Sequence, residues 1–171
     1  MEISTNGRLL IKVCEDFHGL RAADDGYGNA TVGWGCRTSS DRHLSARESE
    51  LLFESRLSDI QSKLPKIYTL QSLWDAIVSL AFNVGPTAVT NSRFWDAVTS
   101  HRNQAAAAEF AGPKGFVNVN GKFDRGLANR RNLELEYWQR SASGWDITTL
   151  THLFIKHNRI ANDFNPADYN V

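Results

Sequence analysis

The sequence has no excess of charge of either sign, because 19 Lys and Arg residues balance 19 Asp and Glu residues. A neutral chain has little long-range field with which to steer itself onto a polyanion. Clusters of Lys and Arg with interleaved aromatic residues are also missing from the sequence. Nucleic acid is therefore not expected as a ligand.

Long apolar runs are absent as well. A helix that spans a bilayer needs about 20 consecutive apolar residues, and no segment of the sequence approaches that length. Residues 1–5 do not have the character of a secretory signal. We therefore expect neither stable insertion into a membrane nor export by a signal within this sequence.

Cysteine is scarce, since Cys14 and Cys36 are the two in the chain and are too few for a disulfide framework. Reduced, partly buried thiols are the expected state, and a bond between the two is the alternative. The histidines show no metal-ligand spacing, because His152 and His157 lie five residues apart and do not share a helix face. No metal and no other cofactor is expected.

The chain does contain apolar residues at helical spacing, and 42% of its 171 residues are hydrophobic, enough for a substantial core. Ser45 and Glu48 form a capping box that opens a helix, and Pro65 ends it. Thr5 and Thr69 are the predicted caps of two others. We expect helices at 6–13, 45–64, 69–84, 92–100, 103–111, 124–140 and 146–160, with a loop at 112–121.

A stretch rich in glycine follows the first expected helix. Glycines and β-forming residues alternate between residues 19 and 35, which favours a small, tightly turned hairpin sheet. Glu15 stands at the end of the preceding helix, and one face of the sheet could carry Asp25 and Thr31 toward it. The alternative is that Asp25 belongs only to a turn and Glu15 only to a solvated helix end.

Two acids and a hydroxyl are the groups that hydrolysis of a glycosidic bond requires. One carboxylic acid protonates the leaving oxygen, and a second carboxylate acts on the opposite face of the sugar. Glu15 and Asp25 could fill these two roles. Thr31 could hold an attacking water against a carboxylate, because a hydroxyl both donates and accepts hydrogen bonds.

Three blocks of sequence carry a family resemblance. They are Leu10-Ile11-Lys12 with Glu15, Asp25, Gly28 and Thr31-Val32-Gly33-Trp34-Gly35; then Leu73 to Gly85, which ends in Phe82-Asn83-Val84-Gly85; and then Gly126-Leu127, Arg130-Arg131 and Glu134. In this order the blocks resemble the phage-type lysozymes, the endolysin muramidases of glycoside hydrolase family 24. The resemblance spans about residues 5 to 140.

The resemblance implies a mainly helical α+β chain with a two-lobed lysozyme-like fold. A small N-terminal lobe would carry the β-hairpin sheet, and a larger C-terminal lobe would be helical. Residues 1–171 are expected to form a single domain, with the small lobe at about 1–45, a linking helix at about 45–64, the helical lobe at about 65–145 and an extra helix and tail at 146–171. That last segment exceeds the usual end of the family, and it either packs against the helical lobe or docks a wall or protein partner.

By resemblance, Glu15 is the general acid, Asp25 is the base or charge stabiliser, and Thr31 positions water. The substrate would be bacterial peptidoglycan, cut between N-acetylmuramic acid and N-acetylglucosamine by a single displacement with inversion. Cys36 departs from the family's usual His, and Asp16 from its usual Gly. An extra residue between the two acids leaves Asp24 as the alternative base, although Asp25 keeps the expected distance to the glycine and threonine that follow.

Supporting residues come from the second and third blocks. Phe82, Asn83 and Ser92 correspond to positions that line the family's saccharide groove, although Asn83 could equally cap its helix. Arg130 or Arg131 is expected to brace the catalytic Glu from behind. At least one of the two is expected to be solvated, because adjacent residues do not share a helix face.

The resemblance also implies where such a protein acts. A phage endolysin, as a monomer, would wait in the host bacterial cytoplasm until another protein opens the membrane, and would then attack the cell wall in the periplasm. A secreted antibacterial effector would share the fold and the chemistry, so it remains an alternative. A non-catalytic peptidoglycan-binding module would have lost one of Glu15, Asp25 and Thr31, and all three are present.

Overall fold

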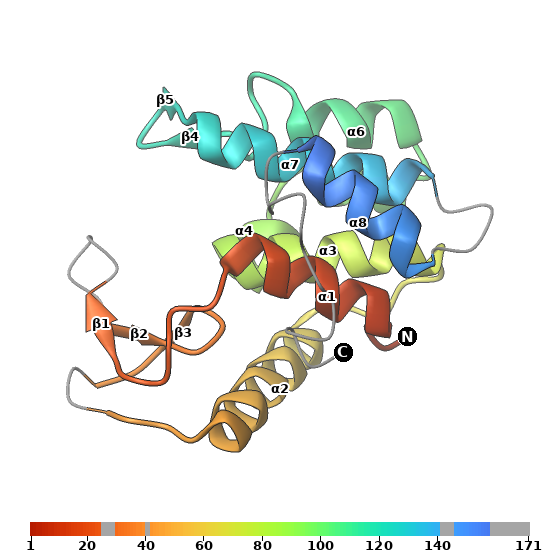
Figure 1. Cartoon of the computed structure of the whole chain (residues 1–171). Coiled ribbons are helices and arrows are strands. Elements are labelled where there is room, and N and C mark those ends of the chain that lie inside the picture. The colour runs from red at the N-terminus through yellow and green to blue at the C-terminus, as the bar shows by residue number, and fades with distance from the viewer. Residues whose placement is uncertain (25–29, 40–41, 141–145, 158–171) are drawn as a thin grey trace.

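The computed structural model describes residues 1–24, 30–39, 42–140 and 146–157, and within them the chain is mainly helical with short antiparallel strands (Figure 1). The α+β class predicted from the sequence is confirmed. Asp25 and its neighbours up to residue 29 lie outside the described residues. The predicted division of residues 1–171 into lobes stays a prediction.

The helices fall where the apolar spacing places them. They are α1 (Thr5–Glu15), α2 (Ala46–Lys63), α3 (Gln71–Val84), α4 (Pro86–Thr90), α5 (Arg93–Thr99), α6 (Asn103–Ala111), α7 (Arg125–Gln139) and α8 (Ile147–Lys156). The short helix α4 was not predicted, because a single turn that begins with a proline after a glycine is too short to show a periodic pattern. Of the described helices, none is both long and apolar enough to cross a membrane.

Two of the three predicted helix caps are wrong. The capping box of Ser45 and Glu48 is present, but α1 is capped by Ser4 and α3 begins after Leu70 without a side-chain cap. Both the backbone nitrogen and the hydroxyl of Ser4 bond to the carboxylate of Asp75 on α3, at 2.9 and 2.5 Å. A tertiary contact therefore selects the cap, and local sequence does not contain that information.

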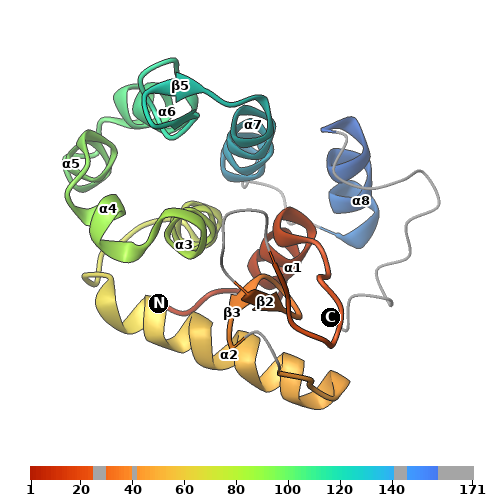
Figure 2. The ribbon, with the colours of Figure 1, turned by 90° about the vertical axis from the view of Figure 1, so that its left-hand side faces the viewer.

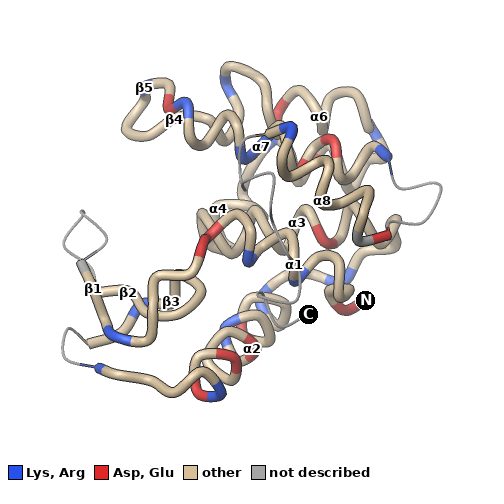
Figure 3. Tube along the Cα trace, in the orientation of Figure 1, with Lys and Arg blue, Asp and Glu red and all other residues tan. Residues whose placement is uncertain are grey.

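Helix α3 is the centre of the helical part of the molecule. Residues 72–82 of this helix are all buried, as expected of a helix that is apolar on every side. Helices α1, α2, α4 and α7 contact it, and the view along its axis shows the other helices arranged around it (Figure 2). Charged residues of both signs are spread along the trace, and α2 carries both (Figure 3).

A three-stranded antiparallel sheet, here called the hairpin sheet, follows α1 and confirms the predicted hairpin. Its strands are β1 (Ala23–Asp24), β2 (Ala30–Val32) and β3 (Cys36–Arg37). Gly33 and Gly35 form the turn between β2 and β3 with φ of 59° and 65°, a region that favours glycine. A Cβ on Gly33 would lie 2.1 Å from the hydroxyl of Ser49, so this turn packs directly against α2.

The predicted loop at 112–121 contains a strand and leads into a second small hairpin. Strands β4 (Asn118–Val119) and β5 (Lys122–Phe123) pair through a turn at Asn120 and Gly121, which both have positive φ. An Asn-Gly pair is the strongest short-range signal for such a turn. The sequence therefore contained the signal for the turn. Strands of two residues are too short to show the alternation of apolar and polar residues that would have predicted the hairpin.

Helix α8 packs against α1 and α7. Its residues Leu150, Leu153 and Phe154 are buried in one cluster with Leu9, Leu10, Val13 and Cys14 of α1 and with Leu133 and Tyr137 of α7. The first alternative for this segment, packing against the helical lobe, accounts for its contact with α7, and the same apolar face also contacts α1, which was not predicted. Cys14 lies in this cluster, and both it and Cys36 are buried and are not joined in a disulfide.

Replacement of Phe154 by Ala tests this packing. The ring is fully buried, so its removal should lower the free energy of unfolding by about 3 to 5 kcal/mol. His152→Ala, on the exposed side of the same helix, should change it by less than about 0.5 kcal/mol. Urea denaturation of the two variants measures the difference, and equal stabilities would show that α8 is not docked.

An acid-sensitive contact also joins α7 and α8. Partial burial raises the pKa of Glu136, but hydrogen bonds from Lys156 and His157 outweigh it, and the net pKa lies below its usual 4.5. Because the pKa is depressed on folding, the associated stability is present above the unfolded pKa and is lost as pH falls through the folded pKa. Glu136→Gln should therefore be less stable than wild type by about 1 kcal/mol at neutral pH, and the two should converge in acid. Thermal unfolding between pH 7 and pH 3 measures this, and a constant difference would contradict it.

Candidate active site

Glu15 is the last residue of α1, and its carboxyl group is held from two sides. Its side chain is 16% exposed, and Oε1 accepts a hydrogen bond of 2.7 Å from Nη1 of Arg130 on α7. On the other side, a Cβ added to Gly35 would lie 2.7 Å from Oε2. The acid therefore sits between α7 and the turn of the hairpin sheet, mostly shielded but reachable by solvent.

Arg130 connects this acid to the interior. Its Nε donates to Glu134 at 3.0 Å, and its Nη2 donates to the carbonyl of Ser79 on α3 at 3.3 Å. Burial lowers the pKa of Arg130, but the nearby carboxylate of Glu15, with Glu134, outweighs it and raises the pKa above its usual range. The guanidinium is thus a permanent cation behind Glu15, and the predicted brace is Arg130.

Arg131 is also buried, so the expectation that one of the two arginines is solvated is wrong. It is fully enclosed and donates to Asn83 and to Glu134, each at 3.2 Å. Burial lowers its pKa to about 10, which still leaves it charged at neutral pH. Helix α7 contacts α3 on one side and α6 on another, and Arg131 lies 5.6 Å from the ring of Phe110 on α6. Because α7 is packed on two sides, Arg130 and Arg131 are both buried although they point in different directions from the helix.

Thr31 lies on β2, the middle strand of the hairpin sheet, and is 6% exposed. Its hydroxyl is 3.4 Å from Nδ1 of His18, and Nε2 of the same ring is 3.1 Å from the carbonyl oxygen of Glu15. One histidine therefore bridges the backbone of Glu15 and the hydroxyl of Thr31. Asp25 lies outside the described residues, so the choice between Asp24 and Asp25 as the second acid stays open.

Side chains of α2 fix the hairpin sheet relative to the helices. Arg56 donates to the carbonyls of Gly35 at 2.6 Å and Phe82 at 2.9 Å, and its guanidinium lies 3.9 Å from the centre of the Phe82 ring. Glu50 accepts from the indole of Trp34 at 2.6 Å and from Lys12 at 2.8 Å. Through these two residues α2 ties the turn beside Glu15 to α1 and α3.

The predicted saccharide-binding residues occupy different environments. Phe82 is 2% exposed and packs against Phe53 in the core. Asn83 is exposed and accepts from Arg131. Ser92 caps α5, and its hydroxyl also donates to Val89 at 2.6 Å. Contact of these residues with a sugar stays a prediction.

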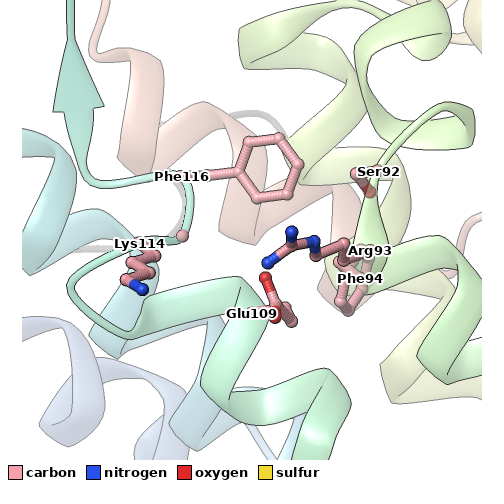
Figure 4. Close-up of a pocket in the computed structure, with 7 residues that line it drawn as sticks. Ser92, Arg93, Phe94, Glu109, Lys114 and Phe116 are labelled. Carbon is pink, nitrogen blue, oxygen red and sulfur yellow. The ribbon is translucent and has the colours of Figure 1, made fainter. Parts of the chain in front are cut away.

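Ser92 also lines a pocket of about 270 Å3 with Arg93, Phe94, Glu109, Lys114, Gly115 and Phe116. The ring of Phe116 points into this pocket, and the side chains of Arg93 and Glu109 point toward one another across it (Figure 4). Both signs of charge and an aromatic face therefore surround the serine.

Sequence reasoning missed three residues of this site. Arg56 occupies the apolar stripe formed by Phe53, Leu57 and Ile60, and a cation at such a position signals an inward partner. The contact of Gly35 with the acid depends on tertiary packing. His18 had no motif or spacing to mark it.

Replacement of Gly35 by Ala tests the contact with the acid. The added methyl would meet both a positive φ and the Glu15 carboxyl, whereas Gly121→Ala would meet a positive φ in open space. We expect Gly35→Ala to cost about 1 to 3 kcal/mol more than Gly121→Ala and to move the NMR signal of the Arg130 side chain. Urea denaturation and NMR measure the two effects, and equal costs with an unmoved signal would contradict the contact.

The chain is similar to known endolysins in sequence and in fold. The chain is 32% identical over 144 residues to the endolysin of Bacillus phage PZA, covering 78% of this chain and 54% of the relative. It is 32% identical over 120 residues to the endolysin of Salmonella phage P22, covering 64% of this chain and 82% of the relative. The solved endolysin of Escherichia coli O157:H7 phage FAHEc1 matches with a TM-score of 0.71 and 25% identity, over 85% of this chain and 98% of that one.

The match to the PZA endolysin spans about half the length of that relative. The family model described as phage lysozyme matches residues 15–134, which begin at the partly shielded Glu15 and end at Glu134, the shared partner of the two arginines. The family match, the relatives and the likeness in fold show that the chain belongs to the phage lysozyme family.

Proposed function

We propose that this protein is a muramidase that hydrolyses the β-1,4 bond between N-acetylmuramic acid and N-acetylglucosamine in peptidoglycan. The observation that carries the proposal is the carboxyl group of Glu15, held by Arg130 at 2.7 Å and shielded to 16% exposure at the end of α1. A carboxyl group in fixed geometry at a partly shielded site suits a general acid. The family of the chain supports the same assignment.

The proposed reaction is a single displacement with inversion. Glu15 protonates the leaving oxygen while a water attacks the anomeric carbon from the opposite face. Asp25, or Asp24 as the alternative, accepts the proton of that water, and Thr31 holds it in place. The buried position of Thr31 on the middle strand supports this role, because it restricts the direction in which the hydroxyl can point.

We also propose that Asn83 and Ser92 contact the sugar chain, with Phe82 in support. The Oδ1 of Asn83 accepts from Arg131, which orients the exposed amide and turns its nitrogen toward other acceptors. An acetamido sugar offers such an acceptor in its carbonyl oxygen. Phe82 is buried, so its part is to hold the end of α3 against Arg56.

The setting that the relatives suggest is host lysis by a phage. Both the PZA and P22 proteins are endolysins. We propose that this chain acts on the cell wall as a monomer after another protein opens the host membrane. The balanced charge of the chain predicts that its activity on isolated walls depends only weakly on salt.

Digestion of isolated peptidoglycan tests the enzyme activity. Wild-type protein should release muropeptides with muramic-acid reducing ends, identified by mass spectrometry, and Glu15→Gln should lower the rate at least about 100-fold because the amide has no acidic proton to give. Glu54→Gln removes an exposed acid on α2 and is the matched control, which should keep the wild-type rate. Intact glycan with measurable binding by both proteins would instead identify a non-catalytic wall-binding module.

The anomer of the first product distinguishes inversion from retention. Proton NMR recorded during digestion should show the α-anomer before mutarotation, as inversion of a β-linkage requires. The β-anomer as first product would mean a covalent intermediate and would overturn direct attack by water.

A further inference from the structure

His18 touches both halves of the site and has no role in the proposed reaction so far. It lies in the connection between α1 and β1, and its ring reaches the carbonyl of Glu15 with Nε2 and the hydroxyl of Thr31 with Nδ1, at 3.1 and 3.4 Å. The residue is exposed, so burial does not explain these contacts. We propose that His18 is a positioning residue that sets the direction of the Thr31 hydroxyl, and this inference rests on the proposed function.

The carbonyl of Glu15 fixes the tautomer of the ring. A backbone carbonyl can only accept, so Nε2 of His18 must carry the hydrogen in that contact. In the neutral imidazole the other nitrogen, Nδ1, then has a lone pair and accepts. The remaining donor between Nδ1 and Thr31 is the hydroxyl, which therefore donates its hydrogen bond to the ring.

This direction matters for the water that Thr31 is proposed to hold. With its one proton committed to His18, the hydroxyl oxygen can only accept from the water. The water then donates one hydrogen bond to Thr31 and the other to the second acid, which takes that proton as the water attacks, and both lone pairs of the water stay free, one of them for the anomeric carbon. If the hydroxyl donated to the water instead, it would occupy one of the water's two lone pairs and draw electron density away from the attacking oxygen.

Backbone contacts hold the histidine in place for this task. The amide of His18 donates to Gly33 at 2.8 Å, and the amide of Gly33 donates to Gly19 at 2.8 Å. Residues 18 and 19 are therefore both bonded through their backbone to the turn of the hairpin sheet. The contact of 3.4 Å is long for a hydrogen bond, and contacts of this kind commonly shorten when substrate binds.

Rates on peptidoglycan or purified glycan oligomers test the inference. The variants are two substitutions of His18, one of Thr31 and their combination, and the control is a substitution of His152. His18→Leu should lower kcat about 10-fold and leave KM within about two-fold, because it affects the attack rather than binding. His18→Asn should recover most of the rate, because its amide oxygen can accept at about the position of Nδ1. His152→Leu, an exposed histidine on α8, should match wild type.

The decisive comparison is a double-mutant cycle with Thr31→Val. If His18 acts through the hydroxyl, His18→Leu should change the rate of the Thr31→Val protein by less than about two-fold. A further loss equal to that seen in the wild-type background would overturn the inference, as would no loss from His18→Leu in an active wild type. Inactivity of the wild type itself would overturn the proposed function instead.

A spectroscopic measurement separates failure of the inference from failure of the proposed function, because it does not depend on enzyme activity. Nitrogen-15 shifts of the neutral His18 ring should show hydrogen on Nε2 and a lone pair on Nδ1, and Thr31→Val should move the Nδ1 signal. Hydrogen on Nδ1, or an unmoved signal in Thr31→Val, would overturn the inference even if the enzyme cleaves peptidoglycan.

Discussion

The ion pair between Arg130 and Glu15 is the interaction on which the rest of the site depends. It joins residues 115 positions apart and brings α7 against the end of α1. Burying charge is costly unless partners compensate it, and here Glu134 and the carbonyl of Ser79 complete the set around the guanidinium. The same carboxylate of Glu134 also pairs with Arg131, so Glu15 and Glu134 together balance the two buried cations. Glu134 also accepts from Ser79 of α3, and Arg131 lies near Phe110 of α6, so this group of charges joins α7 to both helices.

The second requirement is a fixed distance between the acid on α1 and the hydroxyl on the hairpin sheet. Helix α2 supplies it, because Arg56 bonds the turn at Gly35 and the end of α3 at the same time. Misplacement by about 1 Å can reduce a rate by about 100-fold, so rigid links of this kind matter for chemistry as well as for stability. The free thiol of Cys36 lies beside this guanidinium: burial raises the pKa of the thiol, and Arg56 opposes that rise without cancelling it. The thiol is therefore a packing group next to the link.

Helix α8 adds a support outside the matched family region, which ends at residue 134. Its apolar face covers the sides of α1 and α7 that face away from α3. The two helices that present the acid and its arginine are thereby packed on both sides. A polar contact at Glu136 with Lys156 and His157 aligns α8 on the surface of α7.

The sequence by itself determined the helices with clear apolar spacing, the capping box at Ser45, the glycine turn of the hairpin and the identity of Glu15 and Thr31 as candidate groups. These features depend on residues within one or two turns of each other, or on a motif of known spacing. Tertiary structure alone decided that Arg130 and Arg131 are both buried, that Ser4 rather than Thr5 caps α1, and that His18 lies between Glu15 and Thr31. Each of these depends on a charge or a hydrogen-bond partner supplied by a distant segment or by the shape of a turn, and local spacing contains no information about such partners.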